Sequence, residues 1–291
     1  MTEISSSHPR YRSLLVRRAL ADAARSGIVV PEGLIAHGRG EAFDYFLGER
    51  STPSAARAER AAAVWLARAR HPVVSVNGNV AALAAPAIAD LVRALPKLRV
   101  EVNLFHRTPG RAAGIARQLR AAGVPNVLGV RPNARIAGLP SDRASVDARG
   151  IAIADVCLIP LEDGDRAEAL RARGTRVIAI DLNPLSRTAQ VADLPIIDEL
   201  GRALAGITRA LRDLPISPGT FPPFDREAAI SDALRTMEGR LGRAATRTRA
   251  WGPASRRPAR GSGRPTRRAE RTKSSRRRSL RRRRDRRGSA R

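Results

Sequence analysis

Short apolar segments alternate with longer amphipathic segments along most of the chain. Residues 72–78, 98–105 and 154–160 are rich in Val, Ile and Leu, and polar or glycine-containing stretches bound each of them. Segments of this length and composition are typical of strands buried on both faces. The stretches between them repeat apolar residues every three or four positions, as amphipathic helices do. The alternation predicts an α/β fold in which helical crossovers join parallel strands.

The same pattern predicts the individual elements. We predict strands at residues 72–78, 98–105, 126–130, 154–160, 176–183 and 194–197, and helices at residues 10–26, 54–70, 80–95, 110–122, 166–173, 199–211 and 225–241. The glycines within residues 28–49 predict an irregular segment, and residues 131–150 are predicted to form a polar loop. Ligands of open parallel sheets bind beyond the carboxyl ends of the strands, so the segments that follow strands are the candidate sites.

Composition limits the core and the compartment. Of the 291 residues, 43% are apolar but only 3% are aromatic, so the core must consist of Ala, Leu, Val and Ile. The single cysteine, Cys157, excludes a disulfide framework and fits a reducing compartment. The N-terminus lacks a secretory signal, and no segment approaches the ~20 apolar residues that span a bilayer. We therefore expect a cytoplasmic protein without a membrane partner.

The basic charge is concentrated at the C-terminus. Of the formal charge of +27, residues 241–291 carry +19, from 21 Arg or Lys against two acidic residues. Such blocks of like charge are typical of disordered segments, so we predict a folded domain at residues 1–241 and a disordered basic tail at 242–291. The first 240 residues keep a charge of +8, which suits a protein that binds anionic substrates.

Two alternatives remain for the tail. An Arg-rich segment binds any polyanion through counterion release, so the chain could be a nucleic-acid-binding protein that contacts RNA or DNA non-specifically through the tail. Apart from Trp251, however, the tail has no aromatic residue for base stacking. The other alternative is that the tail is a read-through or frameshifted product of an Arg-rich coding sequence.

The shortage of lysine limits how phosphate can be bound. Lys97 and Lys273 are the only lysines, and neither lies in the Gly-Lys-Ser/Thr sequence of a Walker A loop. A GxGxxG fingerprint is also absent, so a dehydrogenase and a kinase are both disfavoured. Phosphate binding must then depend on arginine and on backbone N–H groups, and a metal ion could assist them.

Two segments carry the strongest candidate chemistry. Asp181 and Asn183 end a predicted strand, where they could hold a ribose, a base edge or a metal-bound water, and Arg187 adds a donor for phosphate. An equal alternative is that Asp181 and Asn183 only form a turn. In the second segment, glycines flank Arg39, so the backbone can approach an anion that the guanidinium binds, and His37 can titrate near neutral pH. Its alternative is a flexible loop with exposed charges.

Two further segments follow strands. Glu162, Asp163 and Asp165 could together hold Mg²⁺. They could instead cap the next helix, for which Asp165 is well placed, and both functions can coexist. Asn77 and Asn79 lie at a strand-to-helix turn, where the free N–H groups of the helix could face a phosphate.

Seven segments of the chain form a specific combination when they are taken in order. They are HPRYRSLLVR (His8–Arg17), GLIAHGRGEAFDYFLGE (Gly33–Glu49), PVVSVNGNVAAL (Pro72–Leu83), EVNLFHRT (Glu101–Thr108), the VLGV-x-PNARI-x-GL run (Val127–Leu139), PLEDGDRAEAL (Pro160–Leu170) and VIAIDLNPLSRTA (Val177–Ala189). This combination resembles the archaeal phosphopantothenate synthetases, which are 4-phosphopantoate–β-alanine ligases. The resemblance covers nearly all of residues 8–241. It implies a Rossmann-like parallel sheet with flanking helices behind an N-terminal helical segment, and a homodimer.

The resemblance also implies a reaction and a set of ATP-binding positions. The reaction is the condensation of (R)-4-phosphopantoate with β-alanine to 4′-phosphopantothenate, with ATP split to AMP and diphosphate, in coenzyme A biosynthesis. The implied ATP-binding positions are Arg17, Arg39, Asp181, Leu182, Asn183, Arg187, Thr188, Asp198 and Glu199. Glu199 departs from the family pattern, which has Asn there, so an ATP contact through that side-chain amide would be lost. The basic tail is a second departure, because the family pattern ends near Leu241.

These residues suit the implied chemistry. A carboxylate is a poor electrophile, so ATP would first convert the pantoate carboxyl group into an acyl-adenylate, which the amine of β-alanine then attacks. We expect Arg39 and Arg187 to neutralise the nucleotide phosphates and Asp163 or Asp165 to assist Mg²⁺, although the metal ligands stay unassigned. The substrate-binding candidates are Arg10, His37, Asn77, Asn79 and Arg107. Of these, we expect Arg10 and Arg107 to bind the substrate phosphate.

Overall fold

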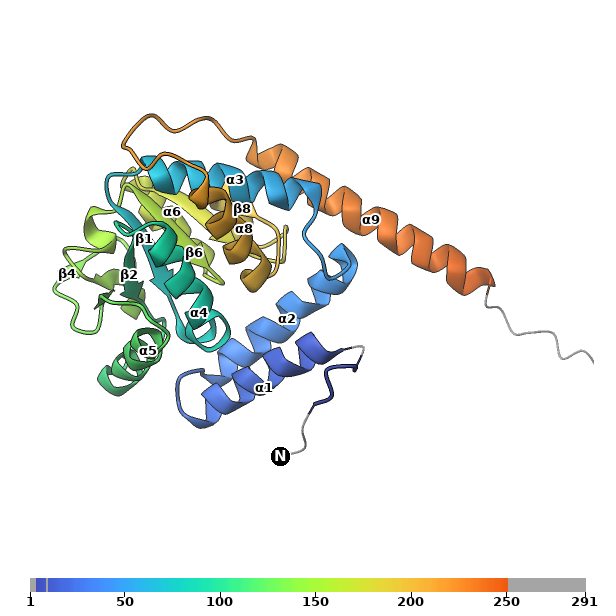
Figure 1. The fold of residues 1–291 in the computed structure, drawn as a ribbon, viewed down its shortest axis with the longest axis horizontal. Helices are drawn as coiled ribbons and strands as arrows, with labels where there is room; N and C mark the ends of the chain where they lie inside the picture. Colours follow the sequence, from blue (N-terminus) through green and yellow to red (C-terminus); the bar gives the residue numbers. More distant parts are fainter. Residues whose placement is uncertain (1–3, 9, 251–291) are drawn as a thin grey trace, which may run out of the picture. The chain divides into compact units, whose positions relative to one another are not determined.

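The computed structural model describes residues 4–8 and 10–250, and its centre is a six-stranded sheet (Figure 1). All neighbouring strands are parallel, and they lie in the order β3-β2-β1-β6-β7-β8. This is the Rossmann-like doubly wound order, with a switch point between β1 and β6. The predicted α/β fold is confirmed. The strands are β1 (Pro72–Val76), β2 (Arg99–Val102), β3 (Val127–Leu128), β6 (Val156–Pro160), β7 (Arg176–Ile180) and β8 (Leu194–Ile196).

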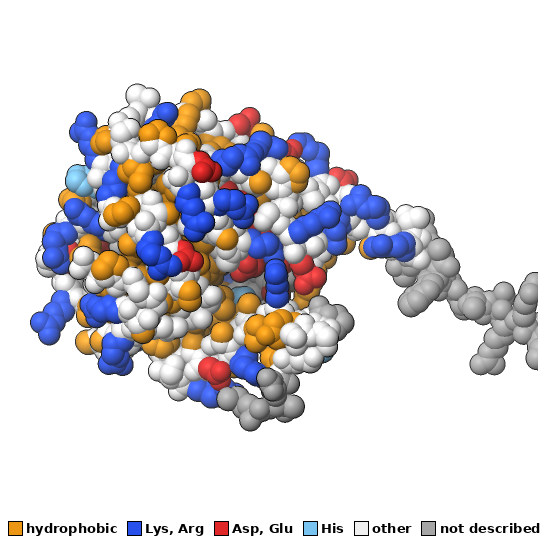
Figure 2. All heavy atoms as spheres, in the orientation of Figure 1, with side chains coloured by type: hydrophobic (Ala, Val, Ile, Leu, Met, Phe, Trp, Pro, Cys, Tyr) orange, Lys and Arg blue, Asp and Glu red, His pale blue; other side chains and the backbone are white. Residues whose placement is uncertain are grey.

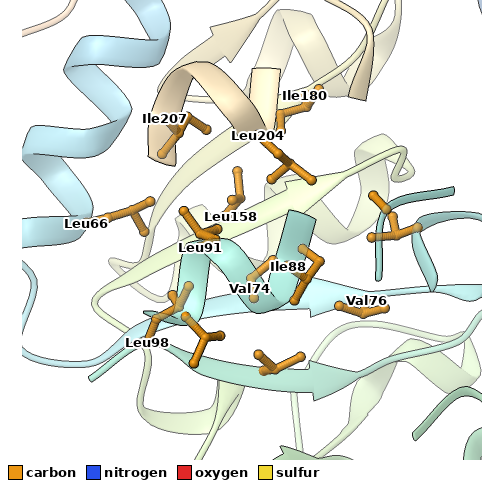
Figure 3. Packing of buried hydrophobic residues seen from close by; sticks show 14 of the residues in the cluster. Leu66, Val74, Val76, Ile88, Leu91, Leu98, Leu158, Ile180, Leu204 and Ile207 are labelled. Carbon is orange, nitrogen blue, oxygen red and sulfur yellow. The ribbon is translucent and has the colours of Figure 1, made fainter. Parts of the chain in front are cut away.

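Side chains that alternate along the strands divide the core into two layers. Val74 and Leu158 point to the face that α3, α4, α5 and α8 cover, where they meet Leu91 and Leu204 (Figure 3). The next residue along β6, Cys157, points to the opposite face, which α6 and the segment before β6 cover. The helices are α1 (Tyr11–Arg25), α2 (Pro31–Leu47), α3 (Pro53–Arg68), α4 (Gly78–Ala94), α5 (Pro109–Ala121), α6 (Gly164–Ala172), α7 (Arg187–Val191), α8 (Leu200–Arg212) and α9 (Arg226–Ala250).

Helix α2 corrects the prediction of an irregular segment at residues 28–49. Pro31 occupies the first turn of the helix, where its missing N–H costs nothing, and Gly48 ends the helix in the left-handed conformation. The internal glycines weaken helix propensity, which is why the sequence pattern hid the helix. At least Gly33 serves packing, because a Cβ atom there would overlap the side chain of Asn79 at the start of α4.

Two further predictions need correction. Residues 131–150 are not an irregular loop, because β4 (Ala134–Arg135) and β5 (Ser145–Val146) form an antiparallel pair inside them. Strand β7 ends at Ile180, so Asp181 and Asn183 lie in the loop that follows the strand.

Helix α9 packs against α2 and α3 and continues past the predicted end at Leu241 to Ala250. Helical structure therefore enters the segment 242–291, for which we predicted disorder. Residues 251–291, where the rest of that prediction falls, lie outside the described residues. Within the described part of the chain, no helix is both long enough and apolar enough to cross a membrane.

Candidate active site

Helix α2 faces the carboxyl ends of the strands and contacts the loops that leave them. The side-chain amide of Asn79, just after β1, donates to the carbonyl of Gly33 at 2.7 Å. Further along α2, Gly40 faces Leu182 of the loop after β7. In Figure 1 the α1–α2 pair lies at the end of the domain where α4 begins, and Figure 2 shows a hollow beside this pair with acidic and basic side chains around it. This edge of the sheet is the candidate site.

The site has two parts. We call α2, the Asp181–Thr188 loop and the start of α8 the β7 half, and the loops after β1, β2 and β6 the β1 half. In the strand order, β2 and β7 are separated by two strands, which corresponds to roughly 14 Å. The outer loops of the two halves are therefore well separated, whereas the loops after β6 and β7 are neighbours and contact each other, as Thr188 and Glu162 do.

The loop after β7 is built by its own side chains. The Asp181 carboxylate accepts from the N–H of Asn183 at 2.9 Å and from the Ser186 hydroxyl at 2.5 Å. The Asn183 side chain in turn accepts from the N–H of Leu185 at 2.9 Å. Asp181 and Asn183 thus do form a turn, and ligand binding by either residue stays a prediction. Burial raises the pKa of Asp181, and the guanidinium of Arg39 is one of the groups that oppose this shift, so Arg39 of α2 lies near this loop.

His37 lies between the charges of two elements. Glu41 on its own helix and Glu199 at the start of α8 both act on its imidazole, but burial dominates and lowers the pKa of His37. The imidazole is therefore neutral at neutral pH. Its Nε2 atom is buried and has no hydrogen-bond partner among the residues that the structure describes.

A salt bridge ties α1 to α2 next to this half. Arg17 contacts the carboxylate of Glu41 at 3.1 Å, and Glu41 also accepts from Ser13 and Tyr45. Burial acts to raise the pKa of Glu41, but the hydrogen bonds from Ser13, Arg17 and Tyr45 outweigh burial and hold this pKa below its usual value. Arg10 donates to the Tyr45 hydroxyl at 3.2 Å. Arg10 and Arg17 therefore lie along α2.

The start of α8 holds the other end of α2. Arg202 pairs with Asp44 of α2 and, at 2.7 Å, with Asp198, which follows β8 and is 1% exposed. Glu199 caps α8, because its carboxylate accepts from the N–H groups of Gly201 and Arg202 at 2.9 and 3.0 Å. Glu199 thus has a structural function that Asn could also provide.

Two other predicted ATP positions have partners within the protein. Arg187 is exposed and pairs with Asp165 and, at 2.7 Å, with Glu168. The Thr188 hydroxyl donates to the carbonyl of Glu162 at 2.8 Å, and Thr188 is 2% exposed. The hydroxyl of Thr188 is thus already bonded within the fold.

The three acidic residues after β6 diverge. Asp163 caps α6 by accepting from the N–H of Arg166 at 3.0 Å, so the helix cap is confirmed, but its residue is Asp163 and not Asp165. Glu162 points inward, and Asp165 points outward to Arg187. No group of three or more His, Cys, Asp or Glu side chains within the described residues could hold a metal ion. The predicted three-carboxylate Mg²⁺ site is wrong.

The β1 half contains a buried ionic network that the sequence did not predict. The side chain of Glu162, 1% exposed, lies between the guanidinium groups of Arg143 and Arg166, and Arg166 also donates to Ser75 of β1 at 2.8 Å. Asn103, just after β2, donates to the backbone carbonyl of Arg143 at 3.1 Å. These residues meet at the switch point between β1 and β6. Asp163 also pairs with Arg143 at 2.8 Å, so two carboxylates balance the two guanidinium groups.

The remaining substrate candidates hold backbone segments. Asn77 caps α4 and donates at 2.8 Å to the carbonyl of Leu161, a non-glycine residue with a φ of 52°. Arg107 donates to the carbonyls of Gly129 and, at 2.9 Å, Val130, while its other terminal nitrogen, Nη1, is buried without a partner among the described residues. Arg10 belongs to the α1–α2 contact, so the structure does not bring Arg10 and Arg107 together.

Comparisons with known proteins assign the fold to a family. A model of the family described as phosphopantothenate/pantothenate synthetase matches residues 54–240. A 4-phosphopantoate–beta-alanine ligase of Methanospirillum hungatei is 56% identical over 240 residues, which cover 82% of this chain and 98% of the relative. The chain belongs to the phosphopantothenate/pantothenate synthetase family.

Two further ligases match the chain over most of its length. Ligases of the same name from Methanosarcina mazei and Thermococcus onnurineus are each 46% identical over 83% of this chain, and the match covers 96% and 94% of their lengths. The resemblance that the seven segments indicated is confirmed. The family match ends at residue 240, inside α9, so the last turns of α9 and the basic tail lie beyond it.

Proposed function

We propose that this chain condenses 4-phosphopantoate with β-alanine, splits ATP to AMP and diphosphate, and serves coenzyme A biosynthesis. The observation that carries the proposal is the match to ligases of that name over almost their whole length. The lack of a Walker A lysine and the presence of arginines at the sheet edge are consistent with it.

The β7 half is our candidate for nucleotide binding. Arg39 is exposed and its charge acts on Asp181 of the loop after β7. It forms no ion pair with the residues that the structure describes, so it can bind phosphates without breaking one. Arg187 would have to exchange Asp165 and Glu168 for a phosphate. Thr188 and Glu199 would contribute through their backbones, because the side chains of both already bond within the fold.

The β1 half is our candidate for the substrate. The free Nη1 group of Arg107 and the N–H groups at the start of α4 are donors for an anion there. Formation of the acyl-adenylate joins the substrate carboxylate to the α-phosphorus and expels diphosphate. The amine of β-alanine then attacks the acyl carbon and expels AMP, and the neutral imidazole of His37 is a candidate acceptor for the ammonium proton.

Mg²⁺ is part of the proposal, but the described residues include no cluster of His, Cys, Asp or Glu that could enclose it. Asp163 and Asp165 each already bond to other groups, and they point apart. An ion that arrives with the triphosphate keeps several waters and needs at most one or two carboxylates. No step of the proposed mechanism depends on a protein-bound metal.

The decisive test is product analysis by mass spectrometry. Purified protein with 4-phosphopantoate, β-alanine and ATP should give 4′-phosphopantothenate and AMP, and omission of either acid substrate should abolish AMP release. Formation of ADP in place of AMP would overturn the acyl-adenylate mechanism. Turnover of pantoate at the same rate as 4-phosphopantoate would overturn the assignment of the substrate.

We also propose that the enzyme is a cytoplasmic homodimer, as the resemblance implies. Leu34 and Ile35 of α2 are exposed apolar residues that such an interface could cover. Sedimentation analysis should give twice the chain mass of 31.4 kDa, and a mass of one chain would overturn the proposal.

The charge of the tail supports a second activity, non-specific binding of RNA or DNA. Residues 241–291 carry +19, and binding by counterion release weakens steeply with salt. Truncation after Ala250 should abolish retention on RNA at low salt and leave ligation unchanged. Unchanged RNA retention by the truncated protein would exclude the tail as its cause.

A further inference from the structure

A buried carboxyl pair lies directly behind the β7 half. Glu59 of α3 is 6% exposed and meets Asp198, which is 1% exposed, in the interface between α3 and α8. Gly206 of α8 makes room for Glu59, because a Cβ atom at this position would overlap the carboxyl group. The interface is thus built around an acidic side chain that the proposed mechanism does not use.

The hydrogen bonds around the pair determine where a proton must lie. One oxygen of Asp198 accepts from the N–H of Glu199 at 2.7 Å and from Arg202 at 2.8 Å, so Asp198 is held as a carboxylate. The other oxygen of Asp198 and the Oε1 atom of Glu59 have no donor among the described residues. Two adjacent ionised carboxylates repel each other strongly, but one shared proton satisfies both oxygens. The proton therefore belongs on Glu59.

We propose that Glu59, in its protonated form, is a positioning residue of the ATP site, which donates to Asp198 and fixes it in place. The inference rests on the proposed function, in which the β7 half binds the nucleotide, and Asp198 lies at the start of α8 in that half. Arg202 extends the effect, since it joins Asp198 to Asp44 of α2, the helix that carries Arg39. Loss of the donor from Glu59 would disturb both walls of the β7 half.

The pair makes this half sensitive to pH. Burial, and then the charge of Asp198, raise the pKa of Glu59 to about 7, while Arg209 and Arg60 oppose the shift. Arg209 lies on α8, Asp198 follows β8, and Arg60 lies beside Glu59 on α3. Above pH 7 Glu59 loses its proton, the hydrogen bond to Asp198 becomes a repulsion, and the affinity for ATP should fall.

The test compares two substitutions that preserve volume. Glu59→Gln keeps a hydrogen-bond donor without the titration, so KM for ATP should stay within about twofold of wild type at pH 6.5 and should no longer rise at pH 8.5. Glu59→Leu removes the donor, so KM for ATP should rise about tenfold at pH 6.5, the equivalent of one hydrogen bond, with KM for β-alanine unchanged. Thr208→Val is the control, because Thr208 is buried in α8 away from the Asp198 contacts and should change only stability.

Calorimetric titration with ATP separates failure of this inference from failure of the proposed function. If wild type makes no AMP, the proposed function fails, and the dissociation constant for ATP replaces KM in the same comparison. A folded Glu59→Leu variant with wild-type affinity for ATP would overturn the inference. A Glu59→Gln variant that keeps the wild-type pH dependence would overturn it as well.

Discussion

The two halves of the sheet edge differ in how their charged side chains are paired. In the β1 half, Glu162 lies buried between Arg143 and Arg166, and the fold itself satisfies their charges. In the β7 half, Arg39 is exposed and the Nε2 atom of His37 lacks a partner among the described residues. Arginines thus hold the structure together in the network around Glu162, whereas Arg39 in the β7 half and the Nη1 atom of Arg107 in the β1 half are available to a ligand. Charge alone therefore does not identify a binding residue.

The largest expected effect is on the network of the β1 half. Arg166→Leu should lower the free energy of unfolding by about 3–5 kcal/mol, because Glu162 would keep its buried charge with one partner fewer. Urea unfolding measures this change. As a control, Arg187→Ala removes exposed ion pairs and should leave stability within experimental error. A similar loss of stability for both variants would break the comparison.

The next effect is on ligand binding in the β7 half. Arg39→Ala should raise KM for ATP about a hundredfold, the equivalent of a charge-assisted hydrogen bond to phosphate, and leave the midpoint of thermal unfolding unchanged. Arg39→Lys should recover only part of the affinity, because lysine lacks the planar fork. A drop in thermal stability as large as that of Arg166→Leu would show that Arg39 is structural.

Two buried carboxyl groups give the two halves a common pH dependence of stability. Burial raises the pKa of Glu59, in α3 behind the β7 half, and of Glu101, in β2 before the β1 half, to about 7, from 4.5 in the unfolded chain. The stability that each contributes is complete below pH 4.5 and is lost as the pH rises through about 7. Over this range each group should lower the free energy of unfolding by roughly 2–3 kcal/mol.

Substitution separates the two groups. The free energy of unfolding should fall between pH 5.5 and pH 8, and in Glu59→Gln this fall should be smaller because one of the two titrating groups is gone. The same variant should also alter the pH dependence of ATP binding. Glu101→Gln should leave ATP binding unchanged, because Glu101 accepts only from backbone N–H groups of Asp147 and Ile151. An equal effect of both variants on ATP binding would contradict the division of the site.

The smallest expected effect is at Arg187. Arg187→Ala should raise KM for ATP by about tenfold, less than Arg39→Ala, because part of what a phosphate would gain is already provided by Asp165 and Glu168. An Asp165→Asn variant leaves Arg187 with only one of its two ion pairs and should lower KM for ATP slightly. Unchanged ATP affinity in Arg187→Ala would remove this residue from the nucleotide site.

The sequence predicted the sheet but missed part of what faces it. The strands were predictable because their runs of Val and Ile leave few alternatives once both faces are buried. Helix α2 was missed because its glycines serve close packing, as at Gly33 against Asn79, and packing partners are not visible in a local pattern. The segment that resembled a flexible loop is thus a rigid wall of the site.

The structure brings two of the predicted site segments together, but the sequence did not show the contacts around them. The Asp181–Thr188 and His37–Tyr45 segments do meet, as their positions at a strand end and in a shared motif indicated. The network of Arg143, Glu162 and Arg166 was not predictable, since its members come together only through the strand order. One local signal was available for Glu59, which interrupts the alanine face of its helix.

Gly206 places a constraint on how this protein can vary. Any side chain at this position would take the space of the Glu59 carboxyl group, so the effects of substitutions at positions 59 and 206 should not be additive. Gly206→Ala should be deleterious alone and tolerated beside Glu59→Ala. Among relatives, positions 59 and 206 should therefore change together. Such covariation would show that selection acts on the buried, protonated carboxyl group of Glu59.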